Sequence, residues 1–288
     1  MMNRRLYSPR YVREILNRYG FRFSKGLGQN FLIDGNIVKG ICRAGEVSKE
    51  DYVLEIGPGL GTMTEEIALN ARKVVAIELD EALLPILDET LKGHDNIEIV
   101  HGDILKVDIV DIIEEKLGGG PIKVIANLPY YATTPIIARL IEEDLNIDSI
   151  VVMVQKEVAD RIVANPGSKE YGSLSVFINF YTYPEVAMEV PRTVFMPQPK
   201  VDSAVMKLKL RRELLEVDRE VFFKVVRSAF GKRRKTILNS LSSGELNLGK
   251  DDIRKVLEAA DIPFNKRAED LKVEHFAKIS EILPPLDI

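Results

Sequence analysis

The sequence predicts an α/β fold with a mostly parallel sheet, followed by a small all-α domain. Between residues 51 and 154, short runs of apolar residues alternate with segments of helical periodicity. Strands that alternate with helices in this way form parallel sheets through right-handed crossovers. After Arg212 the strand-like runs stop and only short helical patterns follow. A chain of 288 residues, 45% of them hydrophobic, can build one large domain and one small one. We expect these domains to be residues 1–212 and 213–288.

Apolar periodicity places the elements of the large domain. A basic amphipathic helix is expected near residues 11–19, and an irregular glycine-containing segment follows at 26–32. The parallel strands are expected at residues 51–56, 73–77, 96–101, 122–126 and 150–154. The helices between them are expected at residues 62–71, 81–92 and 109–117.

The remaining segments show two different patterns. Residues 174–183 and 201–210 alternate with period two, as antiparallel strands do, and a proline-rich loop at 191–199 separates them. The small domain shows helical periodicity instead, which is typical of a short helical bundle. Its helices are expected at residues 221–229, 233–240, 250–259 and 273–283.

Composition excludes several classes of protein. No apolar run approaches the roughly 20 residues that a membrane helix needs. The amino terminus lacks the apolar core of a secretory signal, so we expect a cytoplasmic protein with no membrane partner. The single cysteine, Cys42, rules out an internal disulfide framework. His94, His101 and His275 show no metal-ligand spacing, so no metal site is predicted.

Basic charge is concentrated in two segments of a chain whose net charge is −4. The first thirty residues carry seven Lys or Arg side chains against Glu14 alone. The second segment has five basic residues without an acid between them: Arg227, Lys232, Arg233, Arg234 and Lys235. An isolated basic run is usually a solvated helix start. Two such segments on an otherwise acidic chain favour one face that meets nucleic-acid phosphates.

A glycine-rich turn follows the first expected strand. Gly57-Pro-Gly-Leu-Gly61 lies between a strand and a helix, where backbone can approach a ligand closely. The dinucleotide pattern would require a glycine in place of Thr62, so a nicotinamide site is not favoured. Glu78 ends the second strand, where a carboxylate can accept both hydroxyls of a ribose. Asp103, after the third strand, is placed to accept a hydrogen bond from an adenine amine. Either acid alone would more often be a turn residue or a helix cap.

The most informative stretch is Asn127-Leu-Pro-Tyr130. The lone pair of an adenine amine is delocalised into the ring, and two acceptors, the Asn127 side-chain oxygen and the Leu128 carbonyl, would localise it for attack on a methyl group. Pro129 biases Leu128 away from the helical region, so this carbonyl can project into a cleft. Tyr130 offers a face for an unstacked base. A simple turn after the run 122–126 remains the alternative.

Together these motifs resemble the ribosomal RNA adenine dimethyltransferase family, and the likeness covers nearly the whole chain. The segments that carry it are Glu55-Ile-Gly-Pro-Gly-Leu-Gly61, Ile77-Glu-Leu-Asp80, Gly102-Asp103, Asn127-Leu-Pro-Tyr130, Gly28-Gln-Asn-Phe-Leu32 and Phe195-Met-Pro-Gln-Pro-Lys-Val-Asp-Ser203. The stretch from Arg227 to Leu241 is similar to the helical domain of the family's small-subunit branch. The resemblance implies a Rossmann-like class I methyltransferase fold.

The resemblance also implies a cofactor, a partner and roles for particular residues. The cofactor would be S-adenosylmethionine, with S-adenosylhomocysteine as product, and Phe195 would stack on the target base opposite Tyr130. The substrate would be two adjacent adenosines in the 3′-terminal hairpin loop of 16S rRNA within the immature 30S subunit, each dimethylated on N6 by a monomeric enzyme. The implied cofactor-binding residues are Asn30, Leu32, Gly57, Gly59, Glu78, Asp103 and Asn127.

Several alternatives stay open on the sequence alone. Phe195 could be a core aromatic beside a proline loop, Asn30 a turn former, and Leu32 a packing residue. A 23S rRNA adenine methyltransferase of the macrolide-resistance type shares most of these motifs, although the helical region after Arg212 favours the small-subunit branch. A DNA amino-methyltransferase, and a ribosome-assembly or transcription factor without turnover, are further readings.

Overall fold

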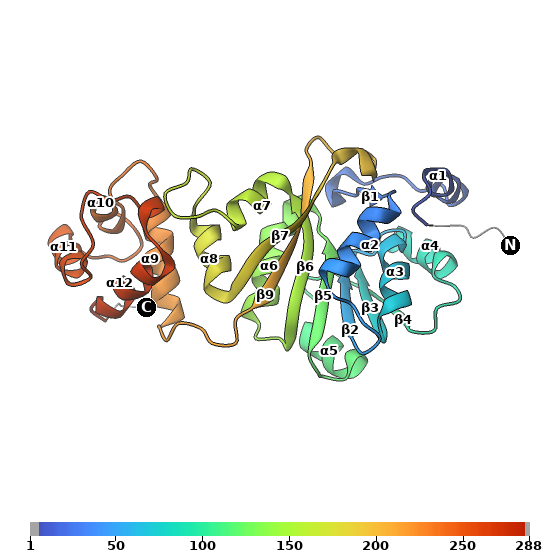
Figure 1. Cartoon of the computed structure of the whole chain (residues 1–288), viewed down its shortest axis with the longest axis horizontal. Helices are drawn as coiled ribbons and strands as arrows, with labels where there is room; N and C mark the ends of the chain where they lie inside the picture. Colours follow the sequence, from blue (N-terminus) through green and yellow to red (C-terminus); the bar gives the residue numbers. More distant parts are fainter. Residues whose placement is uncertain (1–5, 286–288) are drawn as a thin grey trace. The chain divides into compact units, whose positions relative to one another are not determined.

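The structure, a computed structural model, describes residues 6–285. Its main sheet has seven strands in the order β4-β3-β2-β5-β6-β9-β7 (Figure 1). Strands β2 to β6 pair in parallel, and β9 is antiparallel to β6. A separate two-stranded sheet pairs β1 with β8. The strands are β1 (Phe31–Leu32), β2 (Tyr52–Ile56), β3 (Lys73–Glu78), β4 (Ile97–His101), β5 (Ile122–Asn127), β6 (Ile147–Gln155), β7 (Thr182–Val190), β8 (Phe195–Met196) and β9 (Ser203–Leu210).

Helices cover the parallel part of the sheet. One face is buried under α2 and α3, whose apolar residues share a core with β2, β3, β5, β6 and β9. Helix α2 begins where it does because the Asp34 carboxylate accepts hydrogen bonds from the backbone N–H groups of Asn36 and Ile37. The α-helices of this part of the chain are α1 (Pro9–Arg18), α2 (Gly35–Ala44), α3 (Thr62–Asn70), α4 (Leu84–Thr90), α5 (Ile109–Leu117), α6 (Thr133–Glu142) and α7 (Lys156–Ile162).

The five expected parallel strands are confirmed, and so are the expected helices near α1, α3, α4 and α5. Helices α2, α6 and α7 were not among the expected elements. Helix α2 lies next to the glycine-containing segment, α6 directly follows the Asn127-Leu-Pro-Tyr130 motif, and α7 directly follows β6. Helices α2 and α6 flank segments that were singled out for their chemistry, where turn-forming residues obscure the start of a helical pattern.

The strand expected at residues 174–183 is wrong. This stretch forms α8 (Ser173–Tyr181), and β7 begins only at Thr182. The helix buries Leu174, Val176, Ile178 and Phe180, so its apolar residues do not mark a single face. A helix that is buried on several sides loses its 3.6-residue signature, and the apparent alternation then suggests a strand.

The chain divides into two compact units. The first contains residues 6–159 and 185–210 of the described chain, and the second contains 160–184 and 211–285. The expected boundary after residue 212 differs from this division, because α8 packs with the helices that follow β9. The Phe180 and Phe222 rings lie 4.7 Å apart, and Tyr181 stacks on Phe223 at 5.7 Å. This aromatic cluster explains why a segment from the middle of the sequence belongs to the helical unit.

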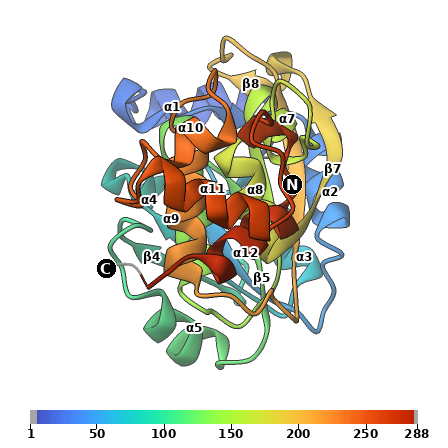
Figure 2. The same ribbon diagram turned by 90° about the vertical axis from the view of Figure 1, so that its left-hand side faces the viewer.

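Four helices after β9 complete the second unit, and Figure 2 shows them from the side of the chain's last helices. The helix expected at residues 233–240 is shorter than expected, since α10 begins only at Ile237. Residues 231–235 form turns instead, which leaves the basic side chains of this stretch exposed. The helices are α9 (Arg219–Phe230), α10 (Ile237–Leu241), α11 (Lys250–Ala259) and α12 (Val273–Ile282).

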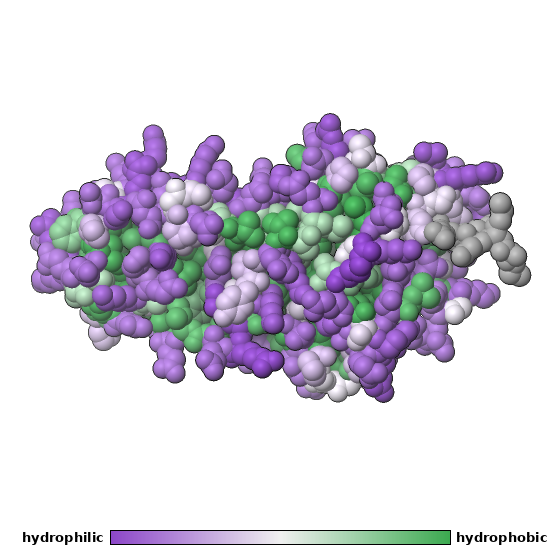
Figure 3. Space-filling model, in the orientation of Figure 1, coloured by the Kyte–Doolittle hydropathy of each residue, from purple (hydrophilic) through white to green (hydrophobic). Residues whose placement is uncertain are grey.

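Polar and charged side chains cover most of the surface drawn in Figure 3. Among residues 6–285, no helix is long and apolar enough to cross a membrane. Arg4 and Arg5, which contribute to the basic amino-terminal segment, lie outside the described residues.

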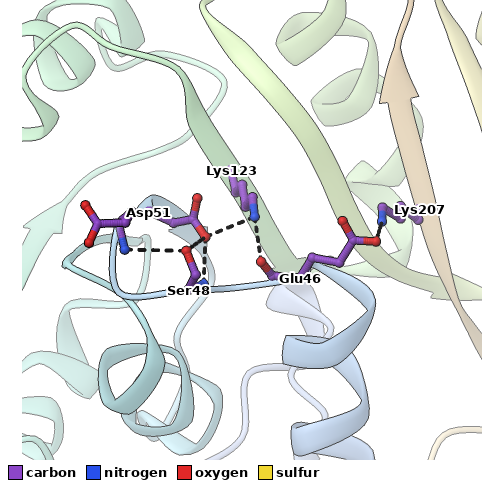
Figure 4. Close-up of polar contacts among 6 residues, drawn as sticks. Glu46, Ser48, Asp51, Lys123 and Lys207 are labelled. Carbon is purple, nitrogen blue, oxygen red and sulfur yellow. Dashed lines mark hydrogen bonds and ion pairs between the residues drawn. The ribbon is translucent and has the colours of Figure 1, made fainter.

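A polar network closes the amino-terminal end of the sheet (Figure 4). The Lys123 ammonium donates to the Glu46 carbonyl at 2.7 Å and pairs with the Asp51 carboxylate at 3.0 Å. The Asp51 carboxylate also accepts from the backbone N–H and the hydroxyl of Ser48. Burial alone would raise the pKa of Asp51, but these hydrogen bonds hold it below its ordinary value. Lys207 pairs separately with the exposed carboxylate of Glu46 at 2.7 Å.

We expect Lys123→Met to lower the free energy of unfolding by about 1–3 kcal/mol, because it leaves Asp51 partly buried without its cation. Urea denaturation at neutral pH measures this loss. Because the folded-state pKa of Asp51 is depressed, the wild-type advantage should be present above the unfolded pKa and disappear as the pH falls through the folded one. Lys207→Met is the matched control, and its loss should be about 0–1 kcal/mol because its partner carboxylate is exposed. Equal losses in the two variants would contradict the assignment.

Candidate active site

Four strand ends meet at the carboxyl edge of the parallel sheet. The order β4-β3-β2-β5 brings Asp103, Glu78, Gly57 and Asn127 into one row. Strands β3 and β5 flank β2 on opposite sides, so the strand order reverses between β2 and β5, and open α/β sheets bind ligands at such a point. All four residues line a single cavity. The strand-end placement expected from the sequence is therefore confirmed, and the roles of these residues remain proposals.

The glycine turn brings backbone close to the cavity. Gly57 and Gly59 have φ angles of 72° and 61°, which favour glycine. A Cβ on Gly59 would also lie 3.0 Å from the Phe31 ring, so a side chain here would crowd the amino-terminal segment. The turn leads directly into α3 at Thr62. The amino end of that helix therefore points toward the ligand space.

Glu78 is buried at the end of β3, with 5% of its surface exposed. One carboxylate oxygen accepts from the Gly59 N–H at 3.1 Å and the other from the Asp80 N–H at 2.8 Å. Burial raises the pKa of this carboxyl, and the backbone hydrogen bonds oppose that shift. Each oxygen keeps a further lone pair, so the side chain can accept the two hydroxyls of a ribose.

Asp103 lies after β4 and lines the same cavity as Glu78. One of its oxygens accepts from the Leu105 N–H at 2.9 Å, which holds the side chain in a local turn. The other lies 3.5 Å from the exposed ammonium of Lys106. The carboxylate therefore keeps acceptor capacity for a donor in the cavity, such as a nucleobase amine.

The Asn127 amide is oriented by the amino-terminal segment. Its Nδ2 donates to the Asn30 carbonyl at 3.1 Å, a contact between residues 97 positions apart. Because the nitrogen is engaged, the side-chain oxygen is left as an acceptor. The Asn30 side chain is itself held by a hydrogen bond from its Nδ2 to the Gly28 carbonyl at 2.9 Å. The segment 28–32 therefore sets the direction of the Asn127 oxygen.

Leu128, Pro129 and Tyr130 leave the sheet and form the next wall of the cavity. Strand pairing of β5 ends at Asn127, and Pro129 adopts φ −62° and ψ 130°, an extended conformation. Leu128 lines the cavity although only 1% of this residue is exposed. Tyr130 is half-buried, and its hydroxyl lies 2.9 Å from the Ser203 hydroxyl at the start of β9. Burial raises the pKa of Tyr130, which keeps its phenol neutral.

The structure does not bring Phe195 to the cavity. Its side chain is 3% exposed and belongs to the core under α2 and α3. In the β1–β8 pair it lies opposite Leu32. Leu32 is also a core residue, at 4% exposed, although it lines the cavity as well. The alternative of a core aromatic therefore describes Phe195, and we do not include it among the residues that meet a base.

Three residues of the site were quoted in sequence motifs without a role. Ser203 holds the Tyr130 hydroxyl. The Gln29 amide donates to the Asp80 carboxylate at 2.5 Å and ties the amino-terminal segment to the end of β3. Glu55, the third, is fully buried at the edge of the cavity. The sequence indicated these residues only through their positions inside the family motifs. A contact between segments that are far apart in sequence produces no local sequence pattern.

Glu55 is an isolated buried carboxyl. Neither of its oxygens has a hydrogen-bond partner among the residues described. Burial raises the pKa of Glu55 to about 8, and Glu78 adds to the shift. The Thr64 hydroxyl offsets part of it, although it does not meet the geometry of a hydrogen bond to either oxygen. Glu55 is therefore largely protonated at neutral pH.

The five basic residues singled out in the sequence belong to the second unit and are exposed. Arg227 pairs with Glu245 at 3.1 Å. Arg233 donates to the Lys169 carbonyl and lies 3.9 Å from Glu269. Within residues 6–285, no group of three or more His, Cys, Asp or Glu side chains is arranged to hold a metal ion.

The sheet order, the glycine turn and the acids at successive strand ends define a Rossmann-like class I methyltransferase. The family model described as ribosomal RNA adenine dimethylase matches residues 20–284. The chain belongs to this family of ribosomal RNA adenine dimethylases.

Individual relatives agree with the family. The chain is 50% identical over 279 residues to the ribosomal RNA small subunit methyltransferase A of Alkaliphilus metalliredigens, covering 96% of this chain and 97% of that protein. It is similar to the crystal structure of a dimethyladenosine transferase from Plasmodium falciparum, with a TM-score of 0.72 and 27% identity over 86% of this chain and 95% of that one. The 23S rRNA methyltransferase ErmE is similar at a TM-score of 0.67 and 28% identity, over 88% and 99% of the two chains.

The raised pKa of Glu55 predicts an unusual pH dependence of stability. An acid whose pKa is higher in the folded chain binds a proton there first, so the free energy of unfolding should fall as pH rises from about 4.5 to about 8. Glu55→Gln cannot ionise. At pH 9 it should therefore be more stable than the wild type by an amount on the order of a few kcal/mol, as measured by denaturation across pH. Glu50→Gln, an exposed change of the same charge, is the control. A parallel pH profile in the wild type and Glu55→Gln would refute a buried titrating carboxyl.

Proposed function

We propose that the protein transfers methyl groups from S-adenosylmethionine to N6 of two adjacent adenosines in the 3′-terminal hairpin loop of 16S rRNA. The observation that supports this proposal is the Asn127 amide, whose nitrogen is engaged by the Asn30 carbonyl, so that its oxygen is left as an acceptor in a residue that lines the cavity. The half-identical relative named as a small-subunit methyltransferase favours 16S rRNA over 23S rRNA. We further propose that the enzyme acts as a monomer on the immature small subunit.

Asn127 and Leu128 would prepare the target amine. The Asn127 side-chain oxygen and the Leu128 carbonyl each accept one N6 hydrogen, which draws the amine toward tetrahedral geometry and directs its lone pair. Tyr130 supports the flipped base by stacking, with its ring held through Ser203. The amine becomes acidic only after it has gained the methyl group, so its proton can pass to water and no strong base is needed.

The residues at the strand ends fit the methyl donor. When bound, S-adenosylmethionine supplies a methyl group on a positively charged sulfur and is left as S-adenosylhomocysteine. The Glu78 carboxylate would accept the ribose hydroxyls, and Asp103 would accept the adenine amine. Gly57 and Gly59 would let the backbone approach the donor, and Asn30 and Leu32 line the same cavity. Glu78 and Asp103 thus offer acceptors for the ribose hydroxyls and the N6 amine, which are hydrogen-bond donors of an adenosine.

The second unit would bind the RNA. Its exposed basic stretch, Lys232 to Lys235, lies in turns, where side chains can reach phosphates. Hairpin loops suit such an enzyme because their bases unstack at low cost.

Mass spectrometry of nucleosides tests the proposal directly. Purified protein and S-adenosylmethionine should convert adenosine to N6,N6-dimethyladenosine in small subunits that lack the modification. Primer extension should then stop at two adjacent positions in 16S rRNA. Modification of 23S rRNA alone would identify the protein as a methyltransferase of large-subunit RNA. Transfer to neither RNA would support a role in ribosome assembly without turnover.

Asn127→Ala should lower the rate of methyl transfer by about 100-fold or more, a loss similar to that for one transition-state hydrogen bond. The dissociation constant of S-adenosylmethionine, measured by calorimetry, should change far less. Glu78→Gln should show the opposite pattern, with weaker cofactor binding as the main effect. Asn146→Ala is the matched control, since this exposed asparagine donates to the Gly119 carbonyl away from the cavity. Near-normal turnover by Asn127→Ala would contradict the amine-binding role.

Replacing Arg233 and Arg234 together with alanine should weaken RNA binding and reduce the slope of log K against log salt by about 2. Filter binding at several salt concentrations measures both quantities. The control is the pair Lys255→Ala and Lys278→Ala, two exposed lysines of the second unit outside the basic stretch. A slope equal to that of the wild type would show that residues 232–235 are a solvated surface that does not bind RNA.

A further inference from the structure

An exposed aromatic ring stands at the cavity directly after the Asn127-Leu-Pro-Tyr130 motif. Tyr131 lines the cavity, and 58% of its surface is exposed. No other large hydrophobic side chain in residues 6–285 is as exposed. A ring left open to water forgoes the stabilisation that burial would bring. Most exposed apolar residues need no explanation, but this one belongs to the wall of the active-site cavity.

The Tyr131 ring packs against the backbone of Gly28. A Cβ on Gly28 would lie 3.6 Å from the Tyr131 ring and 3.8 Å from Pro129, so the ring covers the glycine at van der Waals distance. Gly28 has a φ of 61° and ends the short helix that precedes the amino-terminal strand. The rest of the ring is open, which makes it a supported platform with a free surface.

Tyr130 and Tyr131 occupy the same short 3-10 helix, Tyr130–Ala132, but their side chains differ in exposure and in partners. Tyr130 is half-buried and held by Ser203. Tyr131 has no comparable hydrogen bond to any residue that the structure describes. Consecutive residues of one turn thus line the same cavity with one half-buried aromatic side chain and one exposed aromatic side chain.

We propose that Tyr131 stacks on the nucleobase next to the target adenosine. The inference rests on the proposed function, in which one of two neighbouring bases is swung into the cavity. The base that remains then loses a stacking partner, and a tyrosine ring can replace it. Base-on-aromatic stacking tolerates any base, so the platform suits both steps, in which each adenosine is in turn the target and the neighbour.

The test compares Tyr131→Ala and Tyr131→Phe on a hairpin RNA of the target sequence. Tyr131→Ala should weaken RNA binding and raise KM for RNA about 5- to 100-fold, the loss of one stacked base. The dissociation constant of S-adenosylmethionine should not change in Tyr131→Ala. Tyr131→Phe, which keeps the ring, should bind RNA as tightly as the wild type. With 2-aminopurine in place of the neighbouring base, fluorescence of the complex should be brighter for Tyr131→Ala than for the wild type or Tyr131→Phe, because stacking quenches it.

Leu69→Ala is the matched control, since this leucine is 55% exposed and does not line the cavity. If wild-type protein methylates the RNA and Tyr131→Ala binds it equally well with equal quenching, the inference is overturned while the proposed function stands. Failure of Tyr131→Phe to restore binding would also overturn it, because the hydroxyl and not the ring would then matter. Absence of transfer by the wild type to small subunits that lack the modification would overturn the proposed function and this inference together.

Discussion

The hydrogen bond from the Asn127 amide to the Asn30 carbonyl is the constraint on which the site depends. It connects the end of β5 to a segment that precedes the whole sheet in sequence. An asparagine amide can present either its oxygen or its nitrogen to a ligand, and this bond decides which one. The amino-terminal segment is in turn fixed by the Gln29–Asp80 hydrogen bond and by the pairing of β1 with β8. The orientation of the Asn127 amide thus depends on the amino-terminal segment, which is itself held by the end of β3 and by β8.

The same arrangement explains why the catalytic motif needs so few charged groups. In the proposed mechanism two neutral acceptors prepare the amine, and their positions are set by sheet geometry and by Pro129. The carboxylates that approach the cavity, Glu78 and Asp103, hold the donor in the proposed mechanism. Glu55 is largely protonated at neutral pH, so it adds little negative charge beneath the glycine turn. In the proposed mechanism the neutral acceptors therefore bind the target adenosine, and the charged carboxylates bind the methyl donor.

Sequence alone could predict the sheet and the row of strand-end residues, because parallel strands place their carboxyl ends on one edge. It could not predict that the partner of Asn127 is a backbone carbonyl, since a carbonyl carries no residue-type signal. Ser203 beside Tyr130 was hidden for a related reason, as the two lie 73 positions apart. Phe195 was assigned to the site through resemblance, and only packing shows that its ring is enclosed in the core. Helix α8 was predicted as a strand because its own apolar residues lie on several of its faces, which hides the helical period.

The membership of α8 in the helical unit has a consequence for how this protein can be recombined. That unit is built from two stretches of chain, separated by the last strands of the sheet. A fragment cut after the final strand would lack the aromatic residues that Phe222 and Phe223 pack against. The helical unit therefore cannot be exchanged between relatives as a simple terminal cassette. A functional chimera would have to carry both stretches, with the intervening strands supplied by the host.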